Sequence, residues 1–185
     1  FITAALLALF AAWLIWGNTA LMISRVTVKD EGIPAAFDGL RIAQVSDLHN
    51  AEFGEGNTRL LDTLRNAAPD IIVITGDLVD ANRTDIPLAL HFASEAVKIA
   101  PVYYVSGNHE YGRRDREEIF ARAARAGAVV FRHAMRRDTI GGQELWILGL
   151  DEMGYHRESR RLLEEFSQKE GFKLLLSHFT ERFAG

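Results

Sequence analysis

The chain has 185 residues, enough for one domain with a sizeable hydrophobic core and too few for two ordinary domains. Its composition, 48% hydrophobic and 25% charged, argues against a disordered or fibrous protein. The formal net charge of -4 disfavours nucleic acid as a partner, and the absence of cysteine excludes disulfides, thiolate metal sites and cysteine nucleophiles.

The N-terminal stretch, residues 1–24, carries no ionisable side chain, and the first charge is Arg25. A helix of about 23 such residues would reach about 35 Å, enough to cross a hydrocarbon core of roughly 30 Å. The stretch therefore predicts a single-pass transmembrane anchor over residues 1–24 and a membrane location, with the side of the membrane left open. A cleaved signal peptide and a buried core helix are the alternatives, and Gly17-Asn18-Thr19 is a weak point in the run.

Residues 25–40 are expected to form a linker interrupted by glycine and proline, and a regular alternation of short apolar runs and helical patterns follows. This alternation predicts βαβ units and a largely parallel sheet, the α/β class. The predicted strands are residues 41–46, 71–75, 101–106, 128–131, 145–150 and 172–177. The predicted helices are a segment capped by Asn57 and ended by Pro69, and residues 85–99, 114–126 and 158–169. Gly141-Gly142 predicts a hairpin turn.

Potential metal ligands follow three of the predicted strands, in the segments SDLHN (46–50), TGDLVD (75–80) and SGNHE (106–110). His178 follows the last predicted strand. Because parallel strands bring their carboxyl ends to one edge of a sheet, we expect these segments to converge. Each segment alone is ordinary turn chemistry, but their joint occurrence predicts a dinuclear metal site.

The residue types favour particular ions. Carboxylate, amide and imidazole ligands together suit Mn²⁺, Fe²⁺ or Zn²⁺, and suit Ca²⁺ or Mg²⁺ less well. Asp47 and His49 can hold one ion, and Asp77 has two oxygens that can bridge two ions about 3.5–4 Å apart. Asn108 offers a neutral oxygen that adds no further negative charge. The sequence thus predicts two divalent metal ions as cofactors.

The order Asp-x-His, Gly-Asp, Gly-Asn-His-Glu and His resembles the calcineurin-like metallophosphoesterase superfamily. The segments RIAQVSDLHNAEFG, IIVITGDLVD and PVYYVSGNHEY look like its bacterial membrane-anchored branch, the YkuE/YaeI-type phosphoesterases. The resemblance covers roughly residues 26–185. It implies an α/β/β/α four-layer sandwich, a metallophosphoesterase domain over residues 41–185, and a place in the bacterial cell membrane.

The resemblance also implies ligand roles. Asp47 and His49 would hold the first metal, Asp77 would bridge, and Asn108 and His178 would hold the second. A hydroxide shared by the two metals would attack a phosphomonoester or phosphodiester, making the protein a phosphoric ester hydrolase.

A further group of side chains is expected around the ligands. By the same resemblance His109 would contact the phosphate and help protonate the leaving oxygen, with Glu110 as its orienting partner. Asn50 could contact the phosphate, and Asp151 is either structural or hydrogen-bonded to a ligand. These residues complete the predicted site.

The sequence departs from the family in one respect. Family members continue with a Gly-His-x-His segment whose histidines complete both metal shells, and no such segment occurs before the chain ends at Gly185. The chain is therefore expected to be the N-terminal part of the enzyme, with weak metal binding and little turnover by itself. A membrane-tethered binding protein without activity and a hydrolase of lipid-linked pyrophosphate are the alternatives. The substrate and the oligomeric state are left open.

Overall fold

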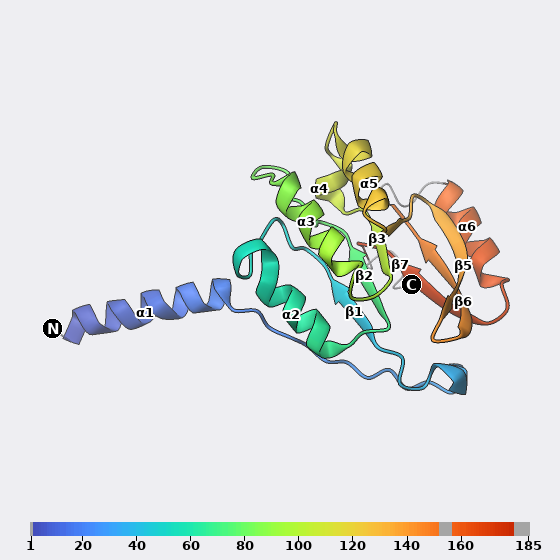
Figure 1. Ribbon diagram of the computed structural model, residues 1–185, viewed down its shortest axis with the longest axis horizontal. Helices are drawn as coiled ribbons and strands as arrows, with labels where there is room; N and C mark the ends of the chain where they lie inside the picture. Colours follow the sequence, from blue (N-terminus) through green and yellow to red (C-terminus); the bar gives the residue numbers. More distant parts are fainter. Residues whose placement is uncertain (1, 152–156, 180–185) are drawn as a thin grey trace.

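The structure is a computed structural model that describes residues 2–151 and 157–179. Two β-sheets lie face to face, and helices cover their outer faces (Figure 1). The larger sheet is parallel, with the order β1-β2-β3-β4. Its strands are β1 (Ile42–Val45), β2 (Ile71–Thr75), β3 (Val102–Val105) and β4 (Val129–Val130). The predicted α/β class and parallel sheet are confirmed.

Strand β2 shows why this sheet is central, since all five of its residues are buried. Ile72 and Ile74 pack among the helices on the outer face, and Ile71 and Val73 pack against the second sheet. This alternation follows the two-residue period of a strand, and only a continuous apolar run can bury both faces.

Three helices cover the outer face of the larger sheet: α2 (Thr58–Ala67), α3 (Ile86–Ala96) and α5 (Arg116–Arg125). Asp85 caps α3 because its carboxylate accepts a hydrogen bond from the amide of Leu88 at 2.9 Å. Asn57 directly precedes α2, as predicted, but its side chain does not cap the helix. Its Oδ1 accepts a hydrogen bond from the amide of Phe53 instead. A turn of 3-10 helix, η2 (Glu55–Asn57), leads into α2.

The second sheet has the order β5-β6-β7. Strands β5 (Ala134–Ile140) and β6 (Gln143–Gly149) form the antiparallel hairpin expected at Gly141-Gly142, and β7 (Phe172–Leu176) is parallel to β6. Helix α6 (Arg157–Ser167) covers its outer face, where Leu148, Leu162 and Phe166 pack together. The order of layers is thus helix, sheet, sheet, helix, as the resemblance implied.

Residue Phe37, within the expected linker, joins the core between the sheets. Phe37 is the last residue of the short helix η1 (Ala35–Phe37). Its ring packs against that of Phe172, with ring centroids 4.6 Å apart. Burial of such a side chain contributes about 1.5–3 kcal/mol. At least the end of residues 25–40 therefore takes part in the fold.

The first helix, α1 (Ile2–Thr19), projects away from the sandwich (Figure 1). It has 18 residues and ends at the Gly17-Asn18-Thr19 stretch, before the apolar run resumes. At 1.5 Å per residue it is about 27 Å long. Among the helices in residues 2–151 and 157–179, none is long and apolar enough to cross a membrane. The expected transmembrane anchor over residues 1–24 is therefore not supported.

Candidate metal centre

The candidate site lies where β1, β2 and β3 end. Past the strands, the first two loops remain paired through backbone bonds from Asp47 to Gly76 (3.1 Å) and from His49 to Asp77 (2.9 Å). Asp47, His49 and Asp77 have φ values of 54°, 47° and 52°, in the left-handed region that non-glycine residues rarely adopt. Such backbone strain persists only where the surroundings hold it, and it is common at functional sites.

Two glycines let the second and third loops touch. A Cβ atom at Gly107 would lie 2.1 Å from Oδ1 of Asp77, and one at Gly76 would lie 2.6 Å from the amide nitrogen of Gly107. Real Cβ atoms essentially never come this close to another heavy atom, so any side chain here would push the loops apart. The Gly-Asp and Gly-Asn spacings therefore reflect direct packing of one loop on the other.

The carboxylate of Asp77 is the centre of the cluster. The side chain of Asp77 is 3% exposed, and its Oδ2 lies 3.6 Å from Nε2 of His49, 3.5 Å from Nε2 of His178 and 4.0 Å from Nε2 of His109. Nε2 of His49 is also 3.7 Å from Oδ1 of Asp47. Histidines from three segments of the chain therefore converge on one oxygen atom of a fourth segment.

The imidazole of His178 is oriented for ligation. Its Nδ1 lies 2.9 Å from the carbonyl oxygen of Thr75, and because a carbonyl only accepts, Nδ1 must carry the proton. Nε2 then presents a lone pair toward Oδ1 of Asn108 at 3.1 Å, so two acceptor atoms face each other, an arrangement that a cation bound by both would stabilise. Donation of the distal ring N–H to a backbone carbonyl is the usual arrangement for a metal-binding histidine.

The imidazole of His109 has the opposite tautomer. The amide of Ala81 donates to its Nδ1 at 3.0 Å, so in the neutral ring the proton lies on Nε2. Nε2 faces the cluster and can donate a hydrogen bond there. Protonating a leaving group would require the doubly protonated ring, whose Nδ1–H would oppose the N–H of Ala81. The geometry thus favours His109 as a hydrogen-bond donor.

Asp80 is a member of the cluster that sequence reasoning did not single out. Its Oδ2 lies 3.8 Å from Nδ1 of His49, a buried atom with no hydrogen-bond partner among the residues that the structure describes. Backbone hydrogen bonds from Arg83 and Asn82 lower the pKa of Asp80 and keep it ionised. The available signal was its position three residues after Asp77, in the same loop.

The donor set fits divalent metal ions. Two groups of three residues bring potential ligand atoms within 4.8 Å of one another: Asp47, Asp77 and His178, and His49, Asp80 and His109. Within the described part of the chain, the only ion-pair partners of these three carboxylates are histidines. Clustered carboxylate and imidazole acceptors without a cation are what Mn²⁺, Fe²⁺ or Zn²⁺ would satisfy.

Comparison with known proteins agrees with this geometry. The profile of the family described as calcineurin-like phosphoesterase matches residues 40–182. The chain belongs to the calcineurin-like phosphoesterase family. It is 27% identical over 136 residues to metallophosphoesterase YkuE of Bacillus subtilis, covering 69% of this chain and 46% of that protein.

Two further relatives extend the match. Metallophosphoesterase YkoQ of Bacillus subtilis is 28% identical over 157 residues, covering 81% of this chain and 56% of that protein. UDP-2,3-diacylglucosamine pyrophosphatase LpxG of Chlamydia trachomatis is 30% identical over 162 residues, covering 82% of this chain and 49% of that protein. The calcineurin-like chain thus spans about half the length of the curated relatives it matches.

The side chain of Asn50 holds a loop beside the candidate site. Its Oδ1 accepts from the amides of Asp80 (2.8 Å) and Asp85 (3.1 Å), and its Nδ2 donates to the carbonyl of Asp85 at 2.6 Å. The expected phosphate contact of Asn50 stays a prediction. What the geometry shows is a side chain that fixes residues 80–85, and with them Asp80 and the Ala81 amide that bonds His109.

The two remaining predicted residues are Glu110 and Asp151. Glu110 is fully buried and accepts from backbone amides, so the hydrogen bonds that the structure records for its carboxylate do not include the ring of His109. Asp151, after β6, accepts from the hydroxyl of Ser106 and from Nε of Arg132 at 2.7 Å. Asp151 therefore ties the second sheet to the residue just before Gly107.

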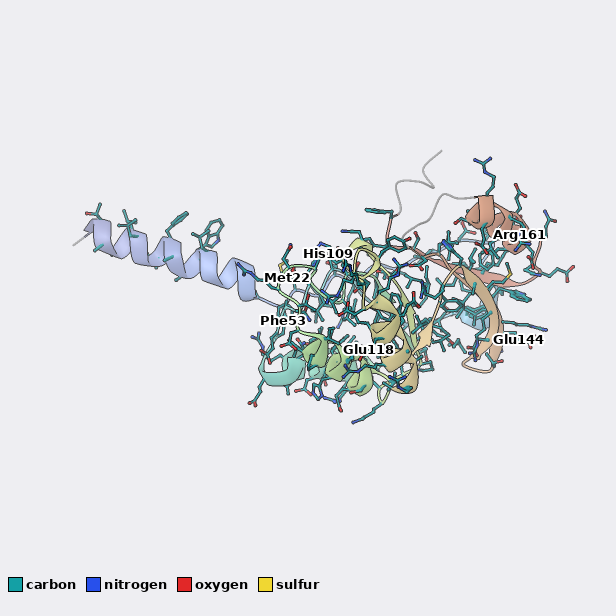
Figure 2. All side chains as sticks on the ribbon, turned by 90° about the horizontal axis from the view of Figure 1, so that it is seen from above. Met22, Phe53, His109, Glu118, Glu144 and Arg161 are labelled. Carbon is teal, nitrogen blue, oxygen red and sulfur yellow. The ribbon has the colours of Figure 1, made fainter. Side chains whose placement is uncertain are left out.

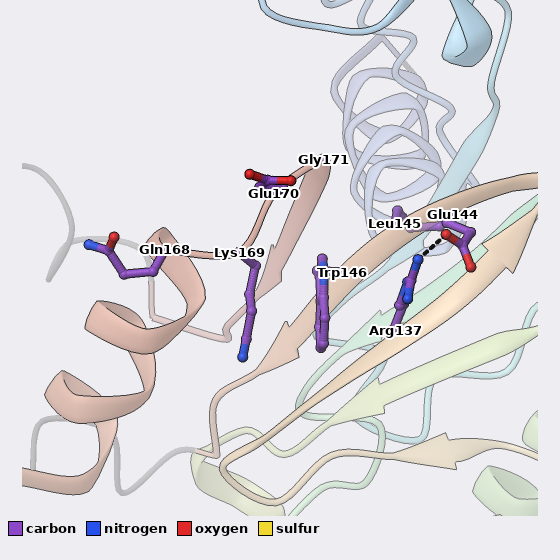
Figure 3. A pocket seen from close by; sticks show the side chains of 8 residues that line it. All are labelled: Arg137, Glu144, Leu145, Trp146, Gln168, Lys169, Glu170 and Gly171. Carbon is purple, nitrogen blue, oxygen red and sulfur yellow. Dashed lines mark hydrogen bonds and ion pairs between the residues drawn. The ribbon is translucent and has the colours of Figure 1, made fainter.

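A separate pocket of about 510 Å³ lies on the second sheet (Figure 3). The side chain of Trp146 lies between those of Lys169 and Arg137, with Nζ of Lys169 5.0 Å from the ring centroid. Arg137 pairs with Glu144, and Lys169 pairs with Glu165 at 2.9 Å. His109 and Glu144 lie far apart on the domain (Figure 2), so this pocket is distinct from the candidate metal centre.

Proposed function

We propose that this chain is the ligand-bearing part of a metal-dependent phosphoesterase that hydrolyses a phosphomonoester or phosphodiester. One observation carries the proposal: Oδ2 of Asp77 lies 3.5–4.0 Å from Nε2 of three histidines. An oxygen in that position can contact two ions at once, the arrangement used by dinuclear hydrolases. The family match supports the same chemistry.

The residues divide into those that hold metal and those that meet the substrate. Asp47, His49, Asp77, Asn108 and His178 would hold two ions, and the geometry adds Asp80 as a further neighbour of His49. When bound, divalent ions lower the pKa of a water molecule and neutralise charge on the phosphoryl oxygens.

His109 completes the site from its own loop. Its Nε2–H, set by the bond from Ala81, donates to a phosphoryl oxygen and steadies the charge that develops there. The role originally expected from the resemblance, general-acid help to the leaving oxygen, would require the bond from Ala81 to open.

The test is hydrolysis of bis(p-nitrophenyl) phosphate and p-nitrophenyl phosphate by the full-length protein with added Mn²⁺. Asp77→Asn should reduce kcat/KM at least about 100-fold because it removes a charged ligand shared by both ions. Asp62→Asn, the same change on the exposed face of α2, is the matched control and should keep full activity. Two bound metals without any ester hydrolysis would contradict the proposal and favour a binding protein without activity.

A second candidate substrate class is a diphosphate ester, as in the lipid-linked pyrophosphates considered from the sequence. It is favoured by the likeness to LpxG, a UDP-2,3-diacylglucosamine pyrophosphatase, over 82% of this chain. Release of UMP from a UDP-sugar, compared with nitrophenol release from bis(p-nitrophenyl) phosphate, separates the two classes. A kcat/KM at least tenfold higher for the diphosphate would favour the second candidate.

A further inference from the structure

Glu110 is a carboxylate enclosed between two of the ligand-bearing loops. It lies in the short helix α4 (Asn108–Tyr111), two residues after Asn108, and its exposed fraction is 0%. A buried carboxylate is costly unless hydrogen bonds replace the water it has lost. Its partners therefore indicate what it does.

Three backbone amides donate to this carboxylate. Oε2 accepts from Asp77 at 2.8 Å and from Gly107 at 2.8 Å, and Oε1 accepts from Val79 at 3.0 Å. The bond from Gly107 is the one that a glutamate commonly makes at the third position of a helix. The other two donors belong to the loop after β2, so capping of α4 accounts for only one of the three bonds.

The result is an interlock between the two loops. Glu110 holds the backbone of Asp77, and Oδ1 of Asp77 in turn accepts from the amide of His109 at 2.8 Å. With Oδ1 held in this way, Oδ2 faces the imidazoles of His49 and His178. The position of Oδ2 relative to Asn108 therefore depends on the bonds that Glu110 makes.

The surroundings leave the carboxylate little room to move. Tyr104 of β3 is fully buried, burial raises its pKa well above the usual range, and the neighbouring charge of Glu110 adds to this shift. On the other side, Gly76 and Gly107 bring the loops so close that no side chain fits between them. All the hydrogen bonds of the interlock join groups of the chain itself.

We propose that Glu110 is a positioning residue that sets the spacing between Asp77 and Asn108 before metal binds. The proposal deepens the proposed function, on which it rests, because it concerns the same metal ligands. It replaces the expectation that Glu110 orients the ring of His109.

The first test is Mn²⁺ affinity by isothermal titration calorimetry, at a temperature where circular dichroism shows both variants folded. Glu110→Gln keeps the shape of the side chain, but its NH₂ group must face one of three backbone N–H donors. We expect Mn²⁺ to bind about 10–100-fold more weakly, the usual effect of removing a group that orients ligands. Glu118→Gln on the exposed face of α5 is the matched control and should bind Mn²⁺ as the wild type does.

A folded Glu110→Gln protein with wild-type Mn²⁺ affinity would overturn the proposal. If Glu110 had a purely structural role, Glu110→Gln would lower Tm but leave the Mn²⁺ affinity measured below Tm unchanged. The readout is also independent of turnover. If the wild type bound Mn²⁺ but hydrolysed no ester, the proposed function would fail while the result for Glu110 would still decide its role.

The second test needs neither a variant nor a metal, and it decides the question if Glu110→Gln does not fold. Amide hydrogen exchange of the metal-free wild type should show Asp77, Val79 and Gly107 protected to within about tenfold of the amides in β2. Exchange of all three amides as fast as amides of an unfolded peptide, with protection appearing only after Mn²⁺ is added, would overturn the proposal.

Discussion

Two clusters of charged side chains on this molecule behave differently. In the pocket of the second sheet, the charges pair with each other, as Arg137 does with Glu144, and both side chains are more than half exposed. At the ends of β1, β2 and β3, carboxylates and imidazoles instead converge on a side chain of Asp77 that is only 3% exposed. In the first cluster Arg137 and Lys169 each pair with a glutamate. In the second, the carboxylates pair only with histidines, within the described residues.

This difference explains why the strand-end cluster is the functional candidate. In the pocket beside Trp146, Arg137 pairs with Glu144 and Lys169 pairs with Glu165. Carboxylate and imidazole groups gathered around the buried side chain of Asp77 form a set of acceptors that a bound cation would satisfy. The strained backbone at Asp47, His49 and Asp77 marks the same place.

The largest expected effect tests how tightly the ligand loops are packed. Gly107→Ala should lower the free energy of unfolding by at least about 3 kcal/mol, because its Cβ would lie 2.1 Å from Asp77 Oδ1. Gly141→Ala, in the hairpin of the second sheet, meets no atom within 4 Å and carries only the strain of its φ of 56°. That strain should cost about 1 kcal/mol. Urea unfolding measures both, and equal losses would contradict the comparison.

A smaller effect tests the link between the two regions. Asp151→Asn should lower the free energy of unfolding by about 2 kcal/mol, because it weakens a buried carboxylate's bonds to Ser106 and Arg132. Glu144→Gln removes an exposed ion pair and should change stability by less than about 1 kcal/mol. Thermal unfolding of the metal-free proteins checks both values. A larger loss for Glu144→Gln would show that the pocket charges matter more than their exposure indicates.

The loop of residues 80–85 provides the next test. Asn50→Ala removes three hydrogen bonds to this loop, so Asp80 and His109 should lose their fixed positions. We expect about a tenfold loss in Mn²⁺ affinity, measured by titration calorimetry. Asn82→Ala changes an exposed residue of the same loop and serves as the control. Unchanged affinity in Asn50→Ala would mean that the ligands are held without this loop.

The smallest effect concerns pH. The Arg132 guanidinium lowers the pKa of Glu117 below its usual value of 4.5, so this pair stabilises the fold above that pH. The contribution is lost as pH falls through the lowered pKa of the folded state. Because Glu117 is exposed, Glu117→Gln should reduce Tm at pH 7 by only about 1 °C and should match the wild type once the pH lies below the lowered pKa of Glu117. Scanning calorimetry of the metal-free proteins tests this.

Local pattern predicted most of the elements. Residues 71–75 form β2 as expected, because a continuous apolar run between turn residues has few alternatives. Strand β5 was missed because its segment AMRRDTI has little apolar alternation and is held by pairing with β6. The short helix α4 was missed because four residues carry no periodicity. The N-terminal apolar run predicted one helix over residues 1–24, whereas α1 ends at Thr19, the last residue of the Gly17-Asn18-Thr19 stretch.

The sequence by itself determined which residues stand at the strand ends, since strand periodicity and the geometry of parallel connections are local rules. These rules alone predict that Asp47, His49, Asp77 and Asn108 are neighbours. Only the tertiary structure decided how they meet. The bond that sets the tautomer of His178 joins residues 103 positions apart, and the carboxylate of Glu110 reaches a loop 33 positions away. The first contact depends on how the two sheets pack and the second on how two loops of one sheet meet, and no local pattern encodes either.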